Sequence, residues 1–482
     1  MIGTILALYD FGSKQEYIYR TSKIKEISGA SVLLAGMYRK FNSILQLQEP
    51  KIELKYTVDE PFELSAFVNG AGKPDGEVLY DGGGNLMVLW RNEDIYTEAN
   101  RRISTYMLKY IPSLSLICSS IPFSGIFDDV VDAQGNIEKR GDRSRLFEQI
   151  ALRKMQFPSY DLPSVMPFTQ IDPMTFLPVT YKRKQNEKGS VYPAFACSLS
   201  SDRYAKASQY GAEDTLDQYE SGLLAVIYID GNAMGSKLIA CRSQDYNEGV
   251  NKLRFFSKQV NRYYVEAPIE AIRKKAFPFR KVVGGGDEIT LICRAEDAFE
   301  IMKLYFDELS KHRLYLSDKE SFLCTSCACI SVFHAKSPFN VAYEIAEATC
   351  EIAKMKSHIQ DGNYFCFYYC HSGVTNSFEA LHSREQQHAS GKPYEISDLP
   401  RINAYAEKLR AVGRANVKVL GDAAQISKAR YAYEVRRVNA YLKGCNGFDG
   451  SEEEMKLVYD MSEFYDLWFG KEVIDDEKNA SN

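Results

Sequence analysis

The tetrapeptide Gly285–Glu288, with the sequence Gly-Gly-Asp-Glu, lies between two short runs that are rich in β-branched residues. These runs, Lys281–Val283 and Ile289–Cys293, are typical of two β-strands joined in a hairpin. The hairpin would carry two adjacent carboxylates, Asp287 and Glu288, at its tip. The tetrapeptide alone also fits an ordinary tight hairpin with solvated acids, so its meaning depends on what else the fold brings to the same edge.

A second acidic residue ends another apolar run earlier in the chain. Leu223–Ile229 has the continuous hydrophobic pattern of a buried strand, and Asp230 follows it directly. A loop with two glycines comes next, formed by Gly231, Asn232, Ala233, Met234 and Gly235. A strand that places one Asp at its end, before a Gly-containing loop, suits a hard cation and a triphosphate. Together with the hairpin, it predicts a nucleotide-polymerising palm domain.

The composition is that of a globular protein with several domains. The chain has 482 residues, of which 45% are hydrophobic and 12% aromatic, and this size predicts two to four domains. No apolar run reaches the roughly 18 residues that span a bilayer, and Met1–Asp10 fits a first β-strand rather than a signal peptide. We therefore expect a cytoplasmic protein without membrane association.

Neither the cysteines nor the charges indicate a further class of site. The eleven cysteines lie mostly in apolar runs, which favours reduced, buried thiols over disulfides. Zinc ligation by two pairs, Cys324 with Cys327 and Cys366 with Cys370, is disfavoured because the first pair falls within an expected strand. The net charge of −5 argues against a nonspecific nucleic-acid coat, and the basic segment Arg401–Lys443 fits a solvated helical face or a surface for phosphate backbones.

The order of the expected elements repeats along the chain. The first copy has strands at residues 4–10, 77–80, 86–90 and 113–119, with helices that extend to residue 40 and over 94–108. The second copy has a strand at 223–229, the hairpin and a strand at 322–333, with helices at 251–274 and 297–309. Both copies read βαββαβ, the ferredoxin-like order. The expected fold class is therefore α+β with two ferredoxin-like palm domains.

These patterns divide the chain into four expected domains. They are a first, non-catalytic palm at 1–120, an irregular Pro-rich insert or small linker domain at 121–220, a second, catalytic palm at 221–374 and a helical C-terminal domain at 375–482. Only the second copy has acids at its hairpin, since the first has Gly82, Gly83, Gly84 and Asn85 there.

Nucleotide polymerisation uses two divalent cations, one for the attacking hydroxyl and one for the triphosphate. Mg²⁺ or Mn²⁺ would be held by short carboxylates at strand ends, which Asp230 and Asp287 provide. Glu288 is either a third ligand or an outward base. Gly285 and Gly286 permit close approach of the backbone to phosphates.

These motifs resemble the large polymerase-like subunit of type III CRISPR effector complexes, whose paired palms make cyclic oligoadenylates. Leu224–Leu238 resembles that family's strand and loop, and Gly285–Glu288 resembles its GGDD hairpin. The first palm matches through Asp10–Gln15 and Ile24–Ser31, and the last strand and helix of the second palm match through Ser326–Pro338 and Ala353-Lys354.

The resemblance implies ATP as substrate, and guide RNA and other CRISPR effector subunits as partners. It implies metal binding by Asp230, Ile229, Asp287 and Glu288. It also implies that Lys354 reaches toward the triphosphate. The implied nucleotide-binding residues are Gly231, Asn232, Ala233, Met234, Gly235, Gly285, Gly286, Lys354, Gly82, Gly83, Gly84, Asn85 and Ser31.

Several departures from the family leave alternatives open. Glu288 replaces an Asp, Asn232 replaces a second loop Asp, no His-Asp dipeptide of an HD nuclease occurs, and the insert lacks the cysteine pairs of a zinc ribbon. One alternative is a catalytically weak scaffold subunit of an RNA-guided complex. Another is a diguanylate-cyclase-like enzyme, which the Asp-Glu pair favours.

Overall fold

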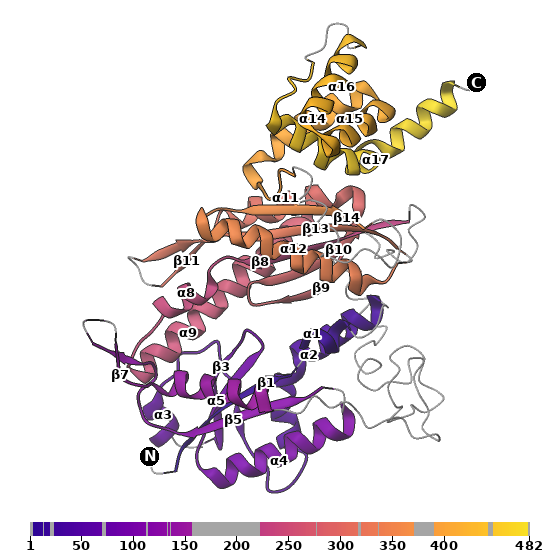
Figure 1. The fold of residues 1–482 in the computed structure, drawn as a ribbon. Coiled ribbons are helices and arrows are strands. Elements are labelled where there is room, and N and C mark those ends of the chain that lie inside the picture. Colours follow the sequence, from indigo (N-terminus) through magenta and orange to yellow (C-terminus); the bar gives the residue numbers. More distant parts are fainter. Residues whose placement is uncertain are drawn as a thin grey trace, which may run out of the picture.

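The computed structural model describes three bodies that follow one another along the chain (Figure 1). The described residues are 3–12, 14–19, 24–69, 74–111, 114–132, 134, 136–156, 222–275, 277–316, 320–335, 337–370, 390–441 and 447–480. Most of the expected insert, residues 157–220, lies outside them. The two sheet bodies are called the first unit and the second unit below, and the third body is the C-terminal bundle.

The first unit has a five-stranded sheet in the order β2-β3-β4-β1-β5. Its elements are β1 (Ile5–Phe11), α1 (Lys14–Tyr19), α2 (Ile24–Leu45), β2 (Leu54–Lys55), α3 (Leu64–Asn69), β3 (Gly76–Gly82), β4 (Asn85–Trp90), α4 (Glu93–Tyr110) and β5 (Leu116–Pro122). Central strand β1 pairs antiparallel with both β4 and β5. This is the predicted ferredoxin-like order, to which the structure adds β2 at the edge.

The beginning of the expected insert is regular rather than irregular. It contains a short ribbon of β6 (Val130–Val131) and β7 (Ile137–Lys139), followed by the helix α5 (Asp142–Gln156). The buried Leu146 and Ile150 of α5 pack in the same cluster as Leu6 and Leu8 of β1. The expectation of an irregular insert is therefore wrong at residues 142–156, where a helix covers one face of the first sheet.

The second unit has a six-stranded sheet in the order β15-β14-β13-β8-β10-β9. Its strands are β8 (Leu223–Gly231), β9 (Phe279–Gly285), β10 (Glu288–Arg294), β13 (Ser326–His334), β14 (Tyr364–Tyr369) and β15 (Tyr394–Glu395). Its main helices are α8 (Met234–Ala240), α9 (Tyr246–Val260), α10 (Ala267–Lys274), α11 (Ala298–Leu309) and α12 (Phe339–Ile359). The strands β13-β8-β10-β9 repeat the ferredoxin-like order, so the predicted α+β fold class is confirmed.

Two expected elements of the second unit are divided in the structure. The expected strand at 322–333 is split, because β12 (Ser321–Leu323) pairs with β11 (Arg313–Tyr315) in a separate ribbon and only β13 joins the sheet. The expected helix at 251–274 consists of α9 and α10 with a π-helical turn at Asn261–Glu266 between them.

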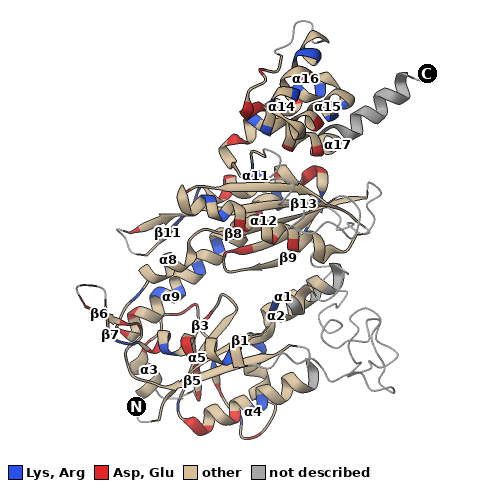
Figure 2. Cartoon of the chain, viewed as in Figure 1, with Lys and Arg blue, Asp and Glu red and all other residues tan. Residues whose placement is uncertain are grey.

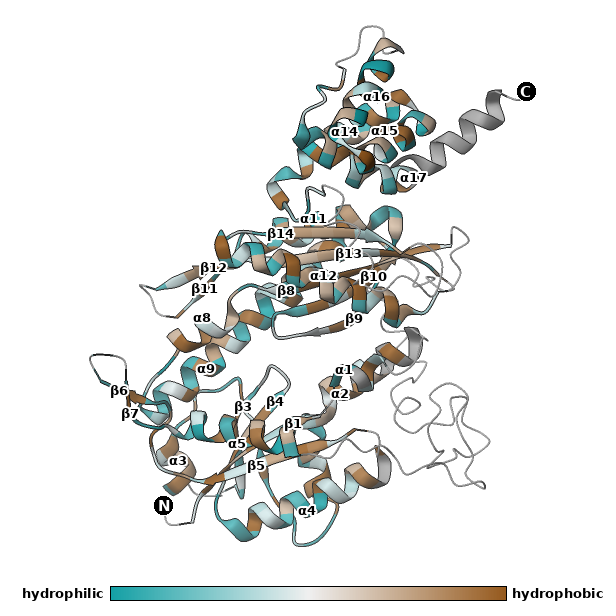
Figure 3. Cartoon of the chain, in the orientation of Figure 1, coloured by the Kyte–Doolittle hydropathy of each residue, from teal (hydrophilic) through white to brown (hydrophobic). Residues whose placement is uncertain are grey.

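Strand β8 is buried on both faces, which explains its unbroken apolar sequence. Its residues alternate between two cores, since Ala225, Ile227 and Ile229 belong to one cluster and Leu224, Val226 and Tyr228 to the other. Figure 3 shows the strands of both sheets mostly in brown, while the helices carry teal faces. A strand held in this way places the residue at its end rigidly.

The two units share a core and are tied together by polar contacts. Tyr228 and Tyr343 of the second unit pack in one cluster with Tyr9 and Phe41 of the first. Arg254 of α9 is buried and donates to the backbone oxygens of Leu79 at 2.8 Å and Val78 at 2.7 Å in the first unit. The helix α9 of the second unit therefore also packs against the first unit.

The C-terminal bundle consists of α14 (Leu399–Val412), α15 (Arg414–Ile426), α16 (Lys428–Tyr441) and α17 (Glu452–Ala480). Many of its described cations are paired, for example Lys408 with the buried Glu454 at 3.2 Å and Arg437 with Glu434 at 2.7 Å. Figure 2 shows blue and red side by side on these helices. This pairing favours a solvated helical face for the basic segment over a phosphate-binding surface.

None of the helices in the described ranges combines the length and the hydropathy needed to cross a membrane.

Candidate nucleotide-binding site

The end of β8 and the β9–β10 turn meet at one edge of the second sheet. The pairing of Ile229 with Ile289 places Asp230 beside the start of β10. The turn places Gly286 at a φ of 67°, a left-handed conformation that favours glycine, and Asp287 follows it. A Cβ atom on Gly231 would lie 2.7 Å from the Cβ of Asp287 and 2.9 Å from its Oδ2. Only a glycine at position 231 leaves room for this carboxylate.

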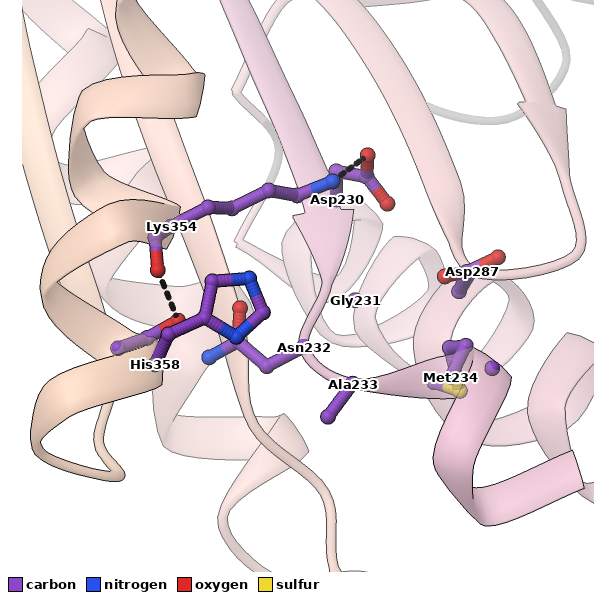
Figure 4. Close-up of a pocket in the computed structure, with 10 residues that line it drawn as sticks. Asp230, Gly231, Asn232, Ala233, Met234, Asp287, Lys354 and His358 are labelled. Atoms are coloured by element: carbon purple, nitrogen blue, oxygen red, sulfur yellow. Dashed lines mark hydrogen bonds and ion pairs between the residues drawn. The ribbon is translucent and has the colours of Figure 1, made fainter. Parts of the chain in front are cut away.

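A pocket of about 310 Å³ opens at this edge (Figure 4). One side is formed by Asp230, Asp287 and the loop Gly231–Gly235, and the other by Lys354, Ser357 and His358 of α12. Figure 4 shows Lys354 extending from α12 toward Asp230, with Asp287 across the pocket. The structure therefore brings together Asp230, Asp287, Lys354 and the five loop residues that the sequence indicated.

The carboxylates of this edge disfavour one another's ionised form. Burial, followed by the negative charge of Asp230, raises the pKa of Asp287 to about 6. Burial and then the charges of Asp230 and Glu347 raise the pKa of Glu288 to about 7. Such mutual repulsion is relieved when a cation is bound between the groups.

Lys354 neutralises one of these acids. Its ammonium group makes an ion pair with Asp230 and lies 3.6 Å from Glu351. Burial lowers the pKa of Lys354, but the hydrogen bond and the charge of Asp230 outweigh this effect, so the pKa is raised. Lys354 is therefore a fixed positive charge at the carboxylate end of the pocket.

Asn232 holds the loop in place with hydrogen bonds that an Asp would not provide in the same way. Its Nδ2 donates to the backbone oxygen of Gly362 at 2.9 Å, and its backbone N–H donates to Thr325 at 2.9 Å. The buried Lys237 donates to the backbone oxygen of Asn232 at 2.8 Å. The loop then turns through Ala233 at a φ of 54° into α8. Asn232 thus supports the loop through its amide.

Glu288 lies next to the pocket but does not line it. Its neighbours by charge are Asp230, Glu347 and Asp287, and Glu347 accepts a hydrogen bond of 2.5 Å from Gln15 of the first unit. Glu288 therefore belongs to the side of the sheet that faces the first unit. No group of three His, Cys, Asp or Glu residues arranged to hold a metal ion occurs among the described residues.

The residues at the pocket still fit a hard cation. Asp230 and Asp287 are two carboxylates on one opening, and the buried Oδ1 of Asn232 has no hydrogen-bond partner among the described residues. Mg²⁺ typically takes one or two protein carboxylates and completes its shell with water and substrate phosphates. A pair of carboxylates is therefore enough, with the backbone of Ile229 directly beside Asp230 in β8.

In the first unit, the acid at the end of β1 is buried and paired with lysines. Asp10 is 2% exposed and forms ion pairs with Lys14 and with Lys154 of α5. Lys14 also donates to the backbone oxygen of Gly84 at 2.9 Å. Two ammonium groups thus neutralise the acid that corresponds in topology to Asp230.

The structure does not place the first-unit nucleotide-binding candidates in the pocket. None of Gly82, Gly83, Gly84, Asn85 and Ser31 lines it, and the side chain of Asn85 donates to Gly83 O at 3.1 Å. The hairpin nevertheless lies against the second unit, because a Cβ atom on Gly82 would be 2.5 Å from the Oγ of Ser257 in α9. Burial chiefly raises the pKa of Tyr80 to about 12, and the charge of Asp81 and then that of Asp287 contribute to the increase. The hairpin of the first unit therefore lies within electrostatic reach of the second.

Sequence reasoning missed two pocket residues, Ser357 and His358. The available signal was their spacing from Lys354, because residues three and four positions apart share one face of a helix.

The fold and the site together define a two-unit α+β protein with a carboxylate- and lysine-lined pocket in its second unit. No family model and no curated protein matches the sequence. Solved structures do match. A chain of the crystal structure of a Csm1-Csm4 cassette in complex with cA4 has a TM-score of 0.51 and 13% sequence identity, and the match covers 97% of this chain and 70% of that one.

A second match is a chain of the Csm1-Csm4 subcomplex in the type III-A CRISPR-Csm interference complex. Its TM-score is 0.50 at 13% identity, over 97% of this chain and 69% of that one. The chain therefore has the fold of a protein in these CRISPR cassettes, which confirms the resemblance at the level of the fold.

Proposed function

We propose that the chain is a metal-dependent nucleotidyltransferase that joins ATP into cyclic oligoadenylate-type second messengers in antiviral defence of the CRISPR type III kind. The observation that carries this proposal is the meeting of Asp230, Asp287 and Lys354 at one pocket of the second unit. The fold supports it, because a similar chain was crystallised in a Csm1-Csm4 cassette in complex with cA4.

The cofactor in this proposal is Mg²⁺ or Mn²⁺, held by Asp230 and Asp287 with the backbone of Ile229. Such a cation lowers the pKa of an attacking hydroxyl and neutralises charge on the phosphates. Glu288 is a candidate for a further ligand or for a base on the side that faces the first unit.

The chain's own groups would orient the donor ATP. Lys354 would exchange part of its interaction with Asp230 for the triphosphate, where a point charge offsets the negative oxygens. The backbone of Gly231–Gly235, together with Gly285 and Gly286, would approach the phosphates closely, since glycines at these turns leave no Cβ in the way. Fixing the donor in this way lowers the entropic cost of the reaction.

The first unit would hold the acceptor nucleotide. Its hairpin, Gly82–Asn85, has no acid to bind a metal, and Gly82 lies against Ser257 of the second unit, because a Cβ atom at position 82 would be 2.5 Å from the Ser257 Oγ. An acceptor placed between the two units, with Ser31 on the first, would present its hydroxyl to the donor. Other CRISPR effector subunits and guide RNA would be the partners of such an enzyme.

Turnover of labelled ATP and of labelled GTP, with Mg²⁺ or Mn²⁺ and with product sizing, tests this function. The proposal predicts oligomeric products from ATP that require the divalent cation. Dinucleotides from GTP would favour the diguanylate-cyclase-like alternative. The scaffold alternative, which the replacements at Glu288 and Asn232 favour, predicts no product from either nucleotide.

A further inference from the structure

The α12 wall of the pocket presents three polar side chains within about one helical turn. Lys354, Ser357 and His358 all line the pocket, and Lys354 and His358 are four residues apart on one helix face. Figure 4 shows the imidazole of His358 pointing into the pocket toward the loop, below Lys354. Their positions on α12 differ by about 6 Å along the helix axis.

The pocket suits a phosphate chain better than a base. No Phe, Tyr or Trp is among the described residues that line it, and its volume of about 310 Å³ is at the low end for ligand pockets. A nucleotide base usually stacks on an aromatic ring or fills an apolar slot. The lining offers carboxylates, an ammonium group, a hydroxyl, an imidazole and loop backbone instead, so a bound nucleotide would leave its base outside this pocket.

Most donors of the pocket already have partners within the protein. Lys354 is paired with Asp230, and the hydroxyl of Ser357 donates to Lys354 O at 2.8 Å. Lys237, beneath the loop, donates to Asn232 O and is 7% exposed. His358 is exposed to solvent, and the described residues give it no hydrogen bond or ion pair. It is thus a donor that the fold does not itself use.

We propose that His358 binds the terminal phosphate of a nucleoside triphosphate and makes the pocket selective for triphosphates over monophosphates. With the metal-binding carboxylates and Lys354 at one end, a phosphate chain that follows α12 reaches His358 one turn further on. The charged groups that face this position are Asp230 of β8, Asp287 of the turn and Lys354 of α12. The choice of ATP as the ligand rests on the proposed function.

The test is calorimetric binding of ATP, ADP and AMP at pH 7 to the full chain, with Mg²⁺, for wild type, His358→Ala and His358→Lys. His312→Gln is the matched control, because this imidazole stacks on Tyr263 and lies outside the pocket lining. We expect His358→Ala to weaken ATP binding about tenfold, as for a lost charge-assisted hydrogen bond, and to leave AMP binding unchanged. His358→Lys should retain the preference for ATP.

Equal losses for ATP and AMP in His358→Ala, unchanged ATP binding, or no ATP binding by wild type would each overturn the inference. The binding readout is separate from turnover. A wild-type chain that prefers ATP through His358 but forms no oligomer contradicts the proposed function and leaves the inference standing. If the wild-type chain forms oligomers and His358→Ala has the same nucleotide preference as wild type, the inference is contradicted and the proposed function stands.

Discussion

Gly231 lies directly against Asp287, since a Cβ atom at position 231 would be 2.7 Å from the Asp287 Cβ. The two residues come from the end of β8 and from the β9–β10 turn, which are separated in sequence by α8, α9 and α10. The close approach is what places Asp287 on the same opening as Asp230. The geometry of the pocket therefore depends on the absence of one side chain.

Gly231→Ala should lower nucleotidyl transfer about 100-fold, because a displacement of the carboxylate by roughly 1 Å disturbs the reacting geometry. Steady-state turnover of labelled ATP measures this. Gly36→Ala is the control, since a Cβ there meets no atom within 4 Å. Equal activity of the Gly231→Ala and Gly36→Ala proteins would show that the contact with Asp287 has no part in the reaction.

Lys354→Ala should weaken ATP binding about tenfold, which corresponds to roughly 1.4 kcal/mol. The reason is the loss of the fixed positive charge at the carboxylate end, which leaves Asp230 to repel the phosphates. Titration calorimetry of wild type and variant measures the change. Lys258→Ala, at a surface lysine with 69% of its side chain exposed, should bind ATP like wild type. An affinity that Lys354→Ala does not alter would mean that this lysine is only structural.

The metal-free protein should lose stability as the pH rises from about 4 to about 7. The pKa of Asp287 is raised to about 6 and that of Glu288 to about 7, so the folded state binds more protons than the unfolded state in this window. Ionisation of Asp287 should cost about 1–2 kcal/mol after allowance for solvent screening. Urea unfolding of wild type and Asp287→Asn at pH 5 and pH 8 measures this loss of stability.

The same unfolding experiment contains its own check. The free energy of unfolding of Asp287→Asn should fall less between pH 5 and pH 8 than that of wild type. Mg²⁺ should stabilise wild type more at pH 8 than at pH 5, because the cation binds the ionised carboxylates. Identical pH profiles for wild type and Asp287→Asn would rule out the repulsion between Asp287 and Asp230.

The fold could be predicted wherever a short stretch of sequence carries the pattern of a strand, a turn or a helix. The apolar run of β8 and the glycines of the hairpin identify both strands, and the repeated order of elements identifies both units. The helix α5 was missed because few of its residues are buried, Leu146 and Ile150 among them, so its apolar face is narrow. The break in the expected strand at 322–333 was missed because Cys324 and Thr325 are buried like strand residues.

The candidate site was predictable to the extent that its residues end strands or form Gly turns. Contacts between distant segments were not. The pairing of Lys154 with Asp10 joins α5 to β1, and the bond from Asn232 to Gly362 O joins two loops. Nothing local to these residues reveals either contact. Glu288 follows Asp287 directly, yet does not line the pocket that Asp287 lines.

The yield of oligonucleotide from labelled ATP and Mg²⁺, compared between wild type and Asp287→Ala, tests the central claim most directly. An acid at a turn that is destabilised by its own charge contributes little to folding, so the variant should remain folded by circular dichroism. The account predicts cation-dependent products from wild type and none from folded Asp287→Ala. Equal product yields from the two proteins would contradict it.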